Sequence, residues 1–130
     1  MKTVNRGLSE QLEEAGYPQE NTYWFWAVEM DKGRETSRWS LCQYDHLLPD
    51  HPKYASPTAD EILDQLPDNI DKDQFYNLFI EKIDNEKWGI RYTNSLPSRD
   101  EEISIAKRWG NSLADATAKC WLYLKKEGLL

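Results

Sequence analysis

The sequence predicts an α+β fold, with an antiparallel sheet of about four strands and helices packed mainly on one face. Three observations support this prediction. Three segments have apolar residues at helical spacing, four have the residue types of strands, and polar turns join the strands in pairs. The chain of 130 residues has the length of one ordinary domain, so we expect a single domain over residues 1–130.

The first helix is expected from Leu8 to Ala15, with Gly16 placed to end it. The next segment, Thr22–Met30, contains four consecutive aromatic residues and predicts a strand. Counting with a period of two puts Trp24, Trp26 and Val28 on one face and Tyr23, Phe25 and Ala27 on the other. Both faces of this strand are therefore mostly apolar.

The turn signal at residues 31–33 predicts a hairpin between this strand and Glu35–Gln43. We expect Trp39 and Leu41 to share the buried face of the hairpin. The following segment, His46 to Ser56, is expected to be a loop, because its density of prolines opposes both helix and strand.

The stretch SPTADEILDQLP predicts the second helix, because Thr58 and Glu61 can form a capping box and Pro67 prevents continuation. Its apolar stripe consists of Ala59, Ile62, Leu63 and Leu66. Asp60 and Glu61 fall on the opposite, solvent-exposed side, as is typical of a helix that lies on a surface.

Two strands are then expected, Phe75–Ile83 and Lys87–Thr93, on either side of a polar turn. The second strand alternates cleanly, with Trp88, Ile90 and Tyr92 pointing inward and Lys87, Arg91 and Thr93 outward. The first also fits helical spacing, so strand and helix both stay open for Phe75–Ile83. The segment Asn94–Asn111 fits neither pattern uniquely.

The last helix is expected from Ser112, which supplies the N-cap, to Glu127, with Gly128 after it. Its inward stripe contains Leu113, Ala116, Cys120, Trp121 and Leu124. The neighbouring small residues Ala114 and Ala118 would let a sheet approach the helix backbone closely.

The overall charge opposes binding to phosphate backbones and anionic lipids. Acidic residues outnumber basic ones by 23 to 16, which gives a net charge of −7, so we expect no nucleic-acid partner and no membrane contact. The N-terminus has no apolar stretch typical of a signal peptide, and no apolar run approaches the ~18 residues of a membrane span. We therefore expect a cytoplasmic protein, in which Cys42 and Cys120 are free thiols.

A metal or catalytic site is conceivable only in the stretch CQYDHLLPDH. Its weak candidate ligands are Cys42, Asp45, His46 and His51. Their spacing matches no recurrent zinc pattern, and no family-type signature surrounds the cysteine, so we expect no metal, no cofactor and no catalytic residues. A solvated loop explains the same residues.

The aromatic run Tyr23, Trp24, Phe25 and Trp26 is the candidate interaction site. Stacking on bases or sugars would need cations close to the rings, so we expect core packing on one face and a protein contact on the other. The leading hypothesis is a non-enzymatic accessory protein that binds a protein partner or itself. The alternatives are a small metal-dependent or thiol hydrolase centred on residues 42–51, and a small-ligand-binding domain with its pocket between the hairpin and the Pro-rich loop.

Two motifs resemble a group of small α+β proteins of bacteria and their phages, to which no activity is assigned. They are the Ser-Pro-Thr helix that ends in Leu-Pro, Ser56 to Pro67, and the Ala-Asp-Ala-x-Ala-Lys start of the last helix, Ala114 to Lys119. The resemblance covers most of the chain. It implies a bacterial or phage intracellular setting and a compact α+β domain, and it transfers no site residues.

Overall fold

The computed structural model describes residues 2–20, 22–43, 52–71, 75–94 and 103–130. The helices are α1 (Arg6–Glu14), α2 (Ala59–Leu63) and α3 (Leu113–Lys126). The strands are β1 (Trp24–Asp31), β2 (Arg34–Gln43), β3 (Lys53–Ala55), β4 (Asn69–Asp71), β5 (Phe75–Asp84), β6 (Lys87–Asn94) and β7 (Ile103–Gly110). They form two antiparallel sheets, ordered β2-β1-β3 and β4-β5-β6-β7. The predicted α+β class is confirmed.

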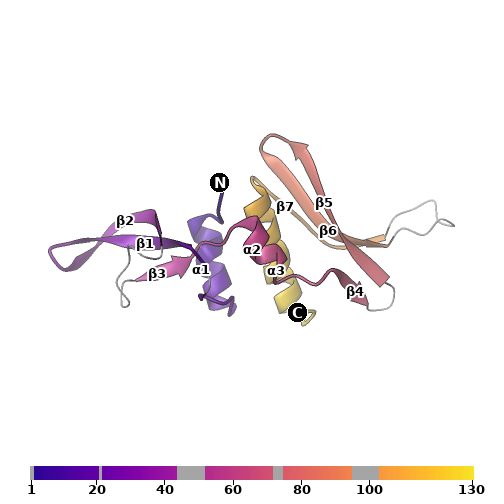
Figure 1. Ribbon diagram of the computed structural model, residues 1–130, viewed down its shortest axis with the longest axis horizontal. Coiled ribbons are helices and arrows are strands. Elements are labelled where there is room, and N and C mark those ends of the chain that lie inside the picture. The colour runs from indigo at the N-terminus through magenta and orange to yellow at the C-terminus, as the bar shows by residue number, and fades with distance from the viewer. Residues whose placement is uncertain (1, 21, 44–51, 72–74, 95–102) are drawn as a thin grey trace.

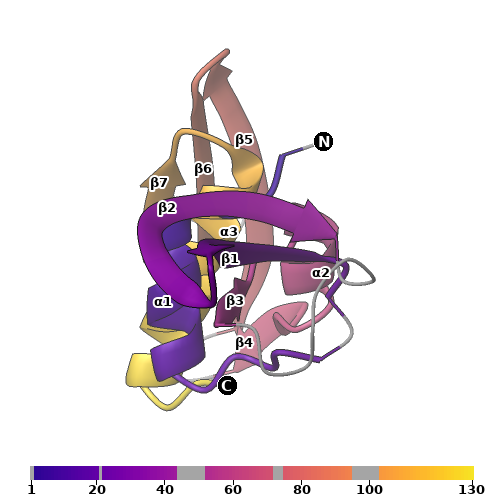
Figure 2. The same cartoon turned by 90° about the vertical axis from the view of Figure 1, so that its left-hand side faces the viewer.

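The helices lie between the two sheets, as Figure 1 shows along the long axis of the molecule and Figure 2 shows from its end. Helix α3 packs against β6 and β7, and α1 contacts both α3 and β3. The four-stranded sheet therefore has its helices on one face, as the sequence predicted. The aromatic hairpin β1–β2 forms a separate three-stranded sheet at the other end.

The expected loop from His46 to Ser56 is wrong for its last residues. Lys53–Ala55 is strand β3, which pairs with β1 so that Trp26 lies opposite Tyr54. The nearest prolines, Pro52 and Pro57, flank the three residues, so no proline interrupts the strand, and the Ala55 backbone N–H on its outer edge donates to Gln19 Oε1 (2.8 Å). Residues 46–51 of the predicted loop lie outside the described part of the chain.

The second hairpin follows the prediction. Phe75–Ile83, which fitted either pattern, lies in strand β5, and Lys87–Thr93 lies in β6. Ile90 and Tyr92 are buried on the inner face as expected. Part of the undecided segment Asn94–Asn111 is strand β7, which pairs with β6.

The caps of α2 and α3 are those that the sequence predicted, whereas α1 begins at Arg6, before the expected Leu8, with Asn5 as its N-cap. The Glu61 backbone N–H donates to Thr58 Oγ1 (3.3 Å), and the Asp115 backbone N–H donates to Ser112 Oγ (3.1 Å). Helix α2 ends at Leu63, before the expected Leu66, although Leu66 is still buried.

The core lies between the helices and the inner face of the four-stranded sheet. It includes Leu12 of α1, Ile62 of α2, Tyr92 of β6 and Leu124 of α3, all of them buried. At Gly110 strand and helix meet so closely that an added Cβ would lie 2.4 Å from the Ala116 backbone nitrogen. The sheet therefore packs closely on the small-residue face of the last helix, as the sequence predicted.

The Tyr23–Trp24 pocket

The aromatic strand β1 packs its Trp26 face towards the N-terminal segment and α1. The indole Nε1 of Trp26 donates a hydrogen bond to the Val4 carbonyl (2.8 Å). On the neighbouring strands, Trp39 stacks on Tyr54 with ring centroids 5.4 Å apart, and the Arg6 guanidinium lies 5.6 Å from the Trp39 ring. Trp26 therefore serves packing, as the sequence predicted for its face of the strand.

The expectation that Leu41 is buried is wrong, because 37% of its surface is exposed. Leu41 lies on β2, an edge strand with a neighbour on one side only. On the opposite face of the sheet, Phe25, Ala27 and Ala55 are buried. Phe25 and Trp26 are thus packing residues, although they were candidates for an interaction site.

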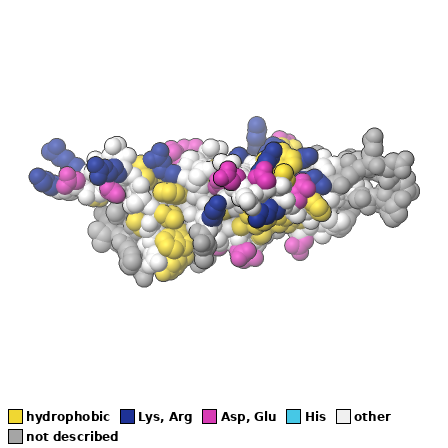
Figure 3. All heavy atoms as spheres, turned by 90° about the horizontal axis from the view of Figure 1, so that it is seen from above, with side chains coloured by type: hydrophobic (Ala, Val, Ile, Leu, Met, Phe, Trp, Pro, Cys, Tyr) yellow, Lys and Arg dark blue, Asp and Glu magenta, His cyan; other side chains and the backbone are white. Residues whose placement is uncertain are grey.

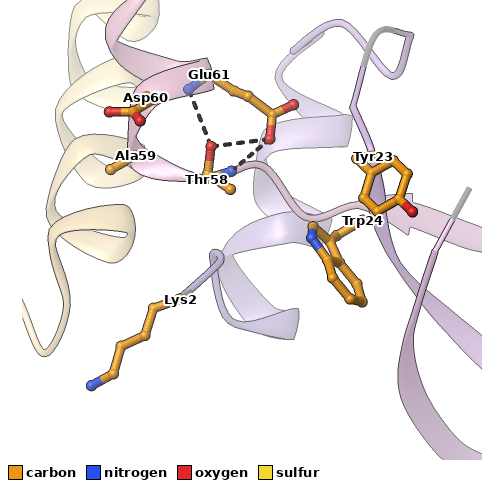
Figure 4. Close-up of a pocket in the computed structure, with 7 residues that line it drawn as sticks. All are labelled: Lys2, Tyr23, Trp24, Thr58, Ala59, Asp60 and Glu61. Carbon is orange, nitrogen blue, oxygen red and sulfur yellow. Dashed lines mark hydrogen bonds between the residues drawn. The ribbon is translucent and has the colours of Figure 1, made fainter.

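Tyr23 and Trp24 differ from the rest of the run. Tyr23 is 50% exposed, and its ring meets the partly buried Trp24 edge to face, with centroids 5.5 Å apart. The two rings border an open pocket of about 440 Å³ (Figure 4). Its other described lining residues are Lys2, Thr58, Ala59, Asp60 and Glu61. Most of this lining is apolar. In Figure 3 a strip of hydrophobic side chains crosses the surface of the three-stranded sheet near the helices.

The capping box holds one carboxylate of the pocket in place. Glu61 Oε1 accepts hydrogen bonds from the Thr58 backbone N–H (3.0 Å) and from Thr58 Oγ1 (3.1 Å). Both bonds use the same oxygen, so Oε2 keeps its capacity to accept from a ligand. Asp60 is exposed, and Figure 4 shows both its carboxylate and the Lys2 amine pointing away from the two rings.

The sequence did not predict that the N-terminus and α2 border this pocket. Thr3 forms an isolated antiparallel bridge with Thr58, and the Val4 backbone N–H donates to the Pro57 carbonyl (3.0 Å). These two long-range contacts bring Lys2 to the start of α2. The exposed, charged side of that helix was predicted, but its aromatic neighbour Trp24 was not.

The weak metal candidates stay largely outside the described residues. Asp45, His46 and His51 all lie in the 44–51 segment. Cys42 is partly buried on β2, where its Sγ lies 3.6 Å from Ser40 Oγ. In the ranges that the structure describes, no group of three His, Cys, Asp or Glu residues is arranged to hold a metal ion.

Cys120 lies in the core and is fully buried. Burial raises the pKa of its thiol to about 12, so the group is protonated at neutral pH. Because the thiolate is the nucleophile, Cys120 is unsuited to covalent catalysis. It packs as a small apolar group, as we expected.

No helix among the described residues is long and apolar enough to span a membrane. The chain matches no protein-family model, no curated protein and no solved structure. What it does must therefore be argued from the pocket itself.

Proposed function

We propose that this is a cytoplasmic accessory protein, of bacterial or phage origin, that binds a partner protein through the Tyr23–Trp24 pocket. The observation that carries the proposal is the half-exposed Tyr23 ring at the mouth of a mainly apolar pocket. Aromatic residues with one apolar side and one polar tip are enriched at protein interfaces. Because half of the Tyr23 surface is already buried, covering the remainder would contribute about half of the ~1.5–3 kcal/mol that full burial of a large apolar side chain gives.

The occupant that fits is an arginine or lysine side chain of the partner. Its aliphatic stem would lie on the Trp24 ring, and its cation would face the carboxylate of Glu61, whose side chain extends towards the rings in Figure 4. The capping box already orients Glu61, which lowers the entropic cost of binding. The net charge of −7 would also steer a basic partner towards the molecule.

A small organic cation is the second candidate. The pocket volume of about 440 Å³ falls within the range of about 300–1,000 Å³ that is usual for small-molecule sites. The pocket is open to solvent on one side, which suits a side chain presented by a protein better than a fully enclosed ligand.

Selection of a random peptide display library on the folded protein tests the proposal. We expect selected peptides to contain arginine or lysine, and a synthetic peptide to bind with a change in tryptophan fluorescence. Replacing its basic residue with norleucine, which keeps the stem and removes the charge, should weaken binding about tenfold. Tyr23→Ala should weaken it by a similar factor, and so should Glu61→Gln, which preserves the capping box.

Phe79→Ala is the matched control, because Phe79 is also an exposed aromatic residue (42%) but belongs to the other sheet. It should leave peptide binding unchanged. Wild-type affinity in Tyr23→Ala, or selected peptides without basic residues, would refute the proposal. Failure to select any peptide, together with saturable binding of a guanidinium-bearing small molecule, would favour the small-ligand alternative.

A further inference from the structure

The outer face of the four-stranded sheet carries aromatic rings and cations together. The inner face packs on α3, whereas the three helices leave the outer face open (Figure 1). Its side chains come from three strands: Phe79 and Glu81 of β5, Lys87 and Arg91 of β6, and Lys107 and Trp109 of β7. In the view of Figure 3, Lys and Arg side chains lie among hydrophobic and acidic ones over this end of the molecule.

A β-bulge turns Trp109 to this outer face. Tyr92 lies opposite Ile105, but Ile90 lies opposite Arg108, so β7 contains one extra residue between the two pairs. Because side chains alternate along a strand, this extra residue reverses which side chains point outward. Ala106, inside the bulge, has a φ of 56°, a conformation that costs about 1–2 kcal/mol for a residue with a Cβ. Trp109 is thereby presented on the outer face.

Two cations flank the Trp109 ring. It lies directly on Gly89, where a Cβ would come within 2.5 Å of Cζ3. The Nζ atoms of Lys107 and Lys87 lie 4.8 and 5.1 Å from the ring centroid. Lys119 Nζ donates to the Trp109 carbonyl (2.9 Å) and adds a further positive charge at this edge.

Phe79 of β5, on the same outer face but two strands away from Trp109, also has a cation next to its ring. It is 42% exposed, and the Arg91 guanidinium lies 4.7 Å from its ring centroid. Arg91 Nη1 also donates to Glu81 Oε1 (3.1 Å), which fixes the cation above the sheet. Phe79 and Trp109 are separated by two strand spacings and two residues, which corresponds to about 12 Å.

We propose that this outer face binds single-stranded nucleic acid. Bases would stack on Trp109 and Phe79, and the phosphates would lie against Lys87, Lys107 and Arg91. Stacked neighbouring bases are only about 3.4 Å apart. The two rings would therefore hold bases that are splayed apart, which a single strand allows and a duplex does not.

The net charge of −7, from which we expected no nucleic-acid partner, is an average over the chain. Among the described side chains of this face, the three cations Lys87, Lys107 and Arg91 accompany one carboxylate, that of Glu81. Salt screens charges beyond about 8–10 Å, so acidic residues on distant elements have little effect here. Asp84 and Glu86 border the face at the β5–β6 turn. The bound nucleic-acid strand should therefore run from Trp109 towards Arg91, away from that turn.

Fluorescence anisotropy of a labelled oligothymidylate of about 15 nucleotides tests this proposal. Binding by the wild-type protein should weaken between about 50 and about 200 mM salt, with a logarithmic slope near −2 for three phosphate contacts. Phe79→Ala should weaken binding about tenfold. Lys107→Gln should weaken it and reduce the slope by about 0.7. Lys32→Gln, in the other hairpin, is the matched control and should change neither quantity.

Saturable, salt-dependent binding that Phe79→Ala and Lys107→Gln both weaken would support the proposal. No binding at low salt would overturn it. Equal affinity for a duplex of the same length would also overturn it, because stacking on the rings requires unpaired bases. Displacement of the oligonucleotide by polyglutamate at equal charge concentration would mean that the face binds acidic protein segments instead.

Discussion

The substitution Gly110→Ala tests most sharply how the four-stranded sheet and α3 fit together. An alanine Cβ at this position would lie 2.4 Å from the Ala116 nitrogen and 2.9 Å from its Cα. Both atoms belong to the helix backbone, so no side chain can rotate away. Strand β7 and helix α3 would have to separate by roughly 1 Å to restore normal contact distances, given that carbon contacts are optimal at about 3.5–4.0 Å.

Such separation loosens the packing of Ala116 and of the neighbouring fully buried Cys120 against the sheet. Overpacking of a core costs about 1–3 kcal/mol, and a backbone clash belongs at the upper end. We therefore expect Gly110→Ala to lower the free energy of unfolding by about 3 kcal/mol. Urea unfolding followed by tryptophan fluorescence measures this as a lower midpoint with an unchanged m-value.

Gly7→Ala supplies a control of opposite sign. Gly7 lies in α1, and its added Cβ would meet only Asn5 Oδ1, at an ordinary 3.6 Å. Since alanine favours a helix over glycine by about 0.5–1 kcal/mol, this variant should be as stable as the wild type or more stable. If the free energy of unfolding of Gly110→Ala lies within about 0.5 kcal/mol of the wild-type value, β7 does not pack as closely on α3 as the structure indicates.

Three further predictions concern buried polar groups. Asp115→Ala removes the carboxylate that accepts hydrogen bonds from the Asn5 backbone N–H (2.9 Å) and from its side-chain amide (3.1 Å). The free energy of unfolding, measured with urea, should therefore fall by about 1–3 kcal/mol, and an unchanged midpoint would contradict this. Cys120, with its raised pKa and full burial, should resist iodoacetamide at pH 8 while the partly buried Cys42 reacts, and equal rates in the native protein would contradict its placement in the core. Burial raises the pKa of Tyr17 to about 12, so the unfolded state releases this proton first. The Tyr17 contribution, measured as the difference in unfolding free energy between the wild type and Tyr17→Phe, should be constant below pH 10 and fall by about 1.4 kcal/mol per pH unit from pH 10 to 12. A difference that does not change with pH would refute this prediction.

The sequence predicted best what depends on neighbouring residues. The capping box of Thr58 and Glu61 and the Ser112 cap are interactions over three residues, and both form as expected. Strand β6 was likewise predicted from its alternation after a short polar turn, whereas the pattern of β5 left strand and helix open. A periodic pattern that adjoins a helix cap or a turn is compatible with few alternative secondary structures.

Pairings between distant segments were not predictable. Strand β3 has only three residues, Lys53–Ala55, and gains its stability from pairing with β1, nearly thirty residues earlier. That pairing closes a separate three-stranded sheet, so the aromatic hairpin does not join the four-stranded one. No local pattern in Lys53–Ala55 indicates which strand it will meet.

The candidate surfaces illustrate the same limit. The sequence marked the whole run from Tyr23 to Trp26, but only the structure separates the exposed Tyr23 from the buried Phe25. The outward position of Lys87 and Arg91 followed from alternation. The outward position of Trp109 did not, because the bulge at Ala106 reverses the alternation within β7.

The central claim is that two exposed aromatic surfaces of this protein bind different ligands. It is tested most directly by measuring the selected basic peptide and the oligothymidylate against Tyr23→Ala and Phe79→Ala in parallel. We predict that Tyr23→Ala loses about tenfold in peptide affinity and keeps oligonucleotide affinity, and that Phe79→Ala does the reverse. Wild-type affinity of both variants for both ligands would contradict the claim.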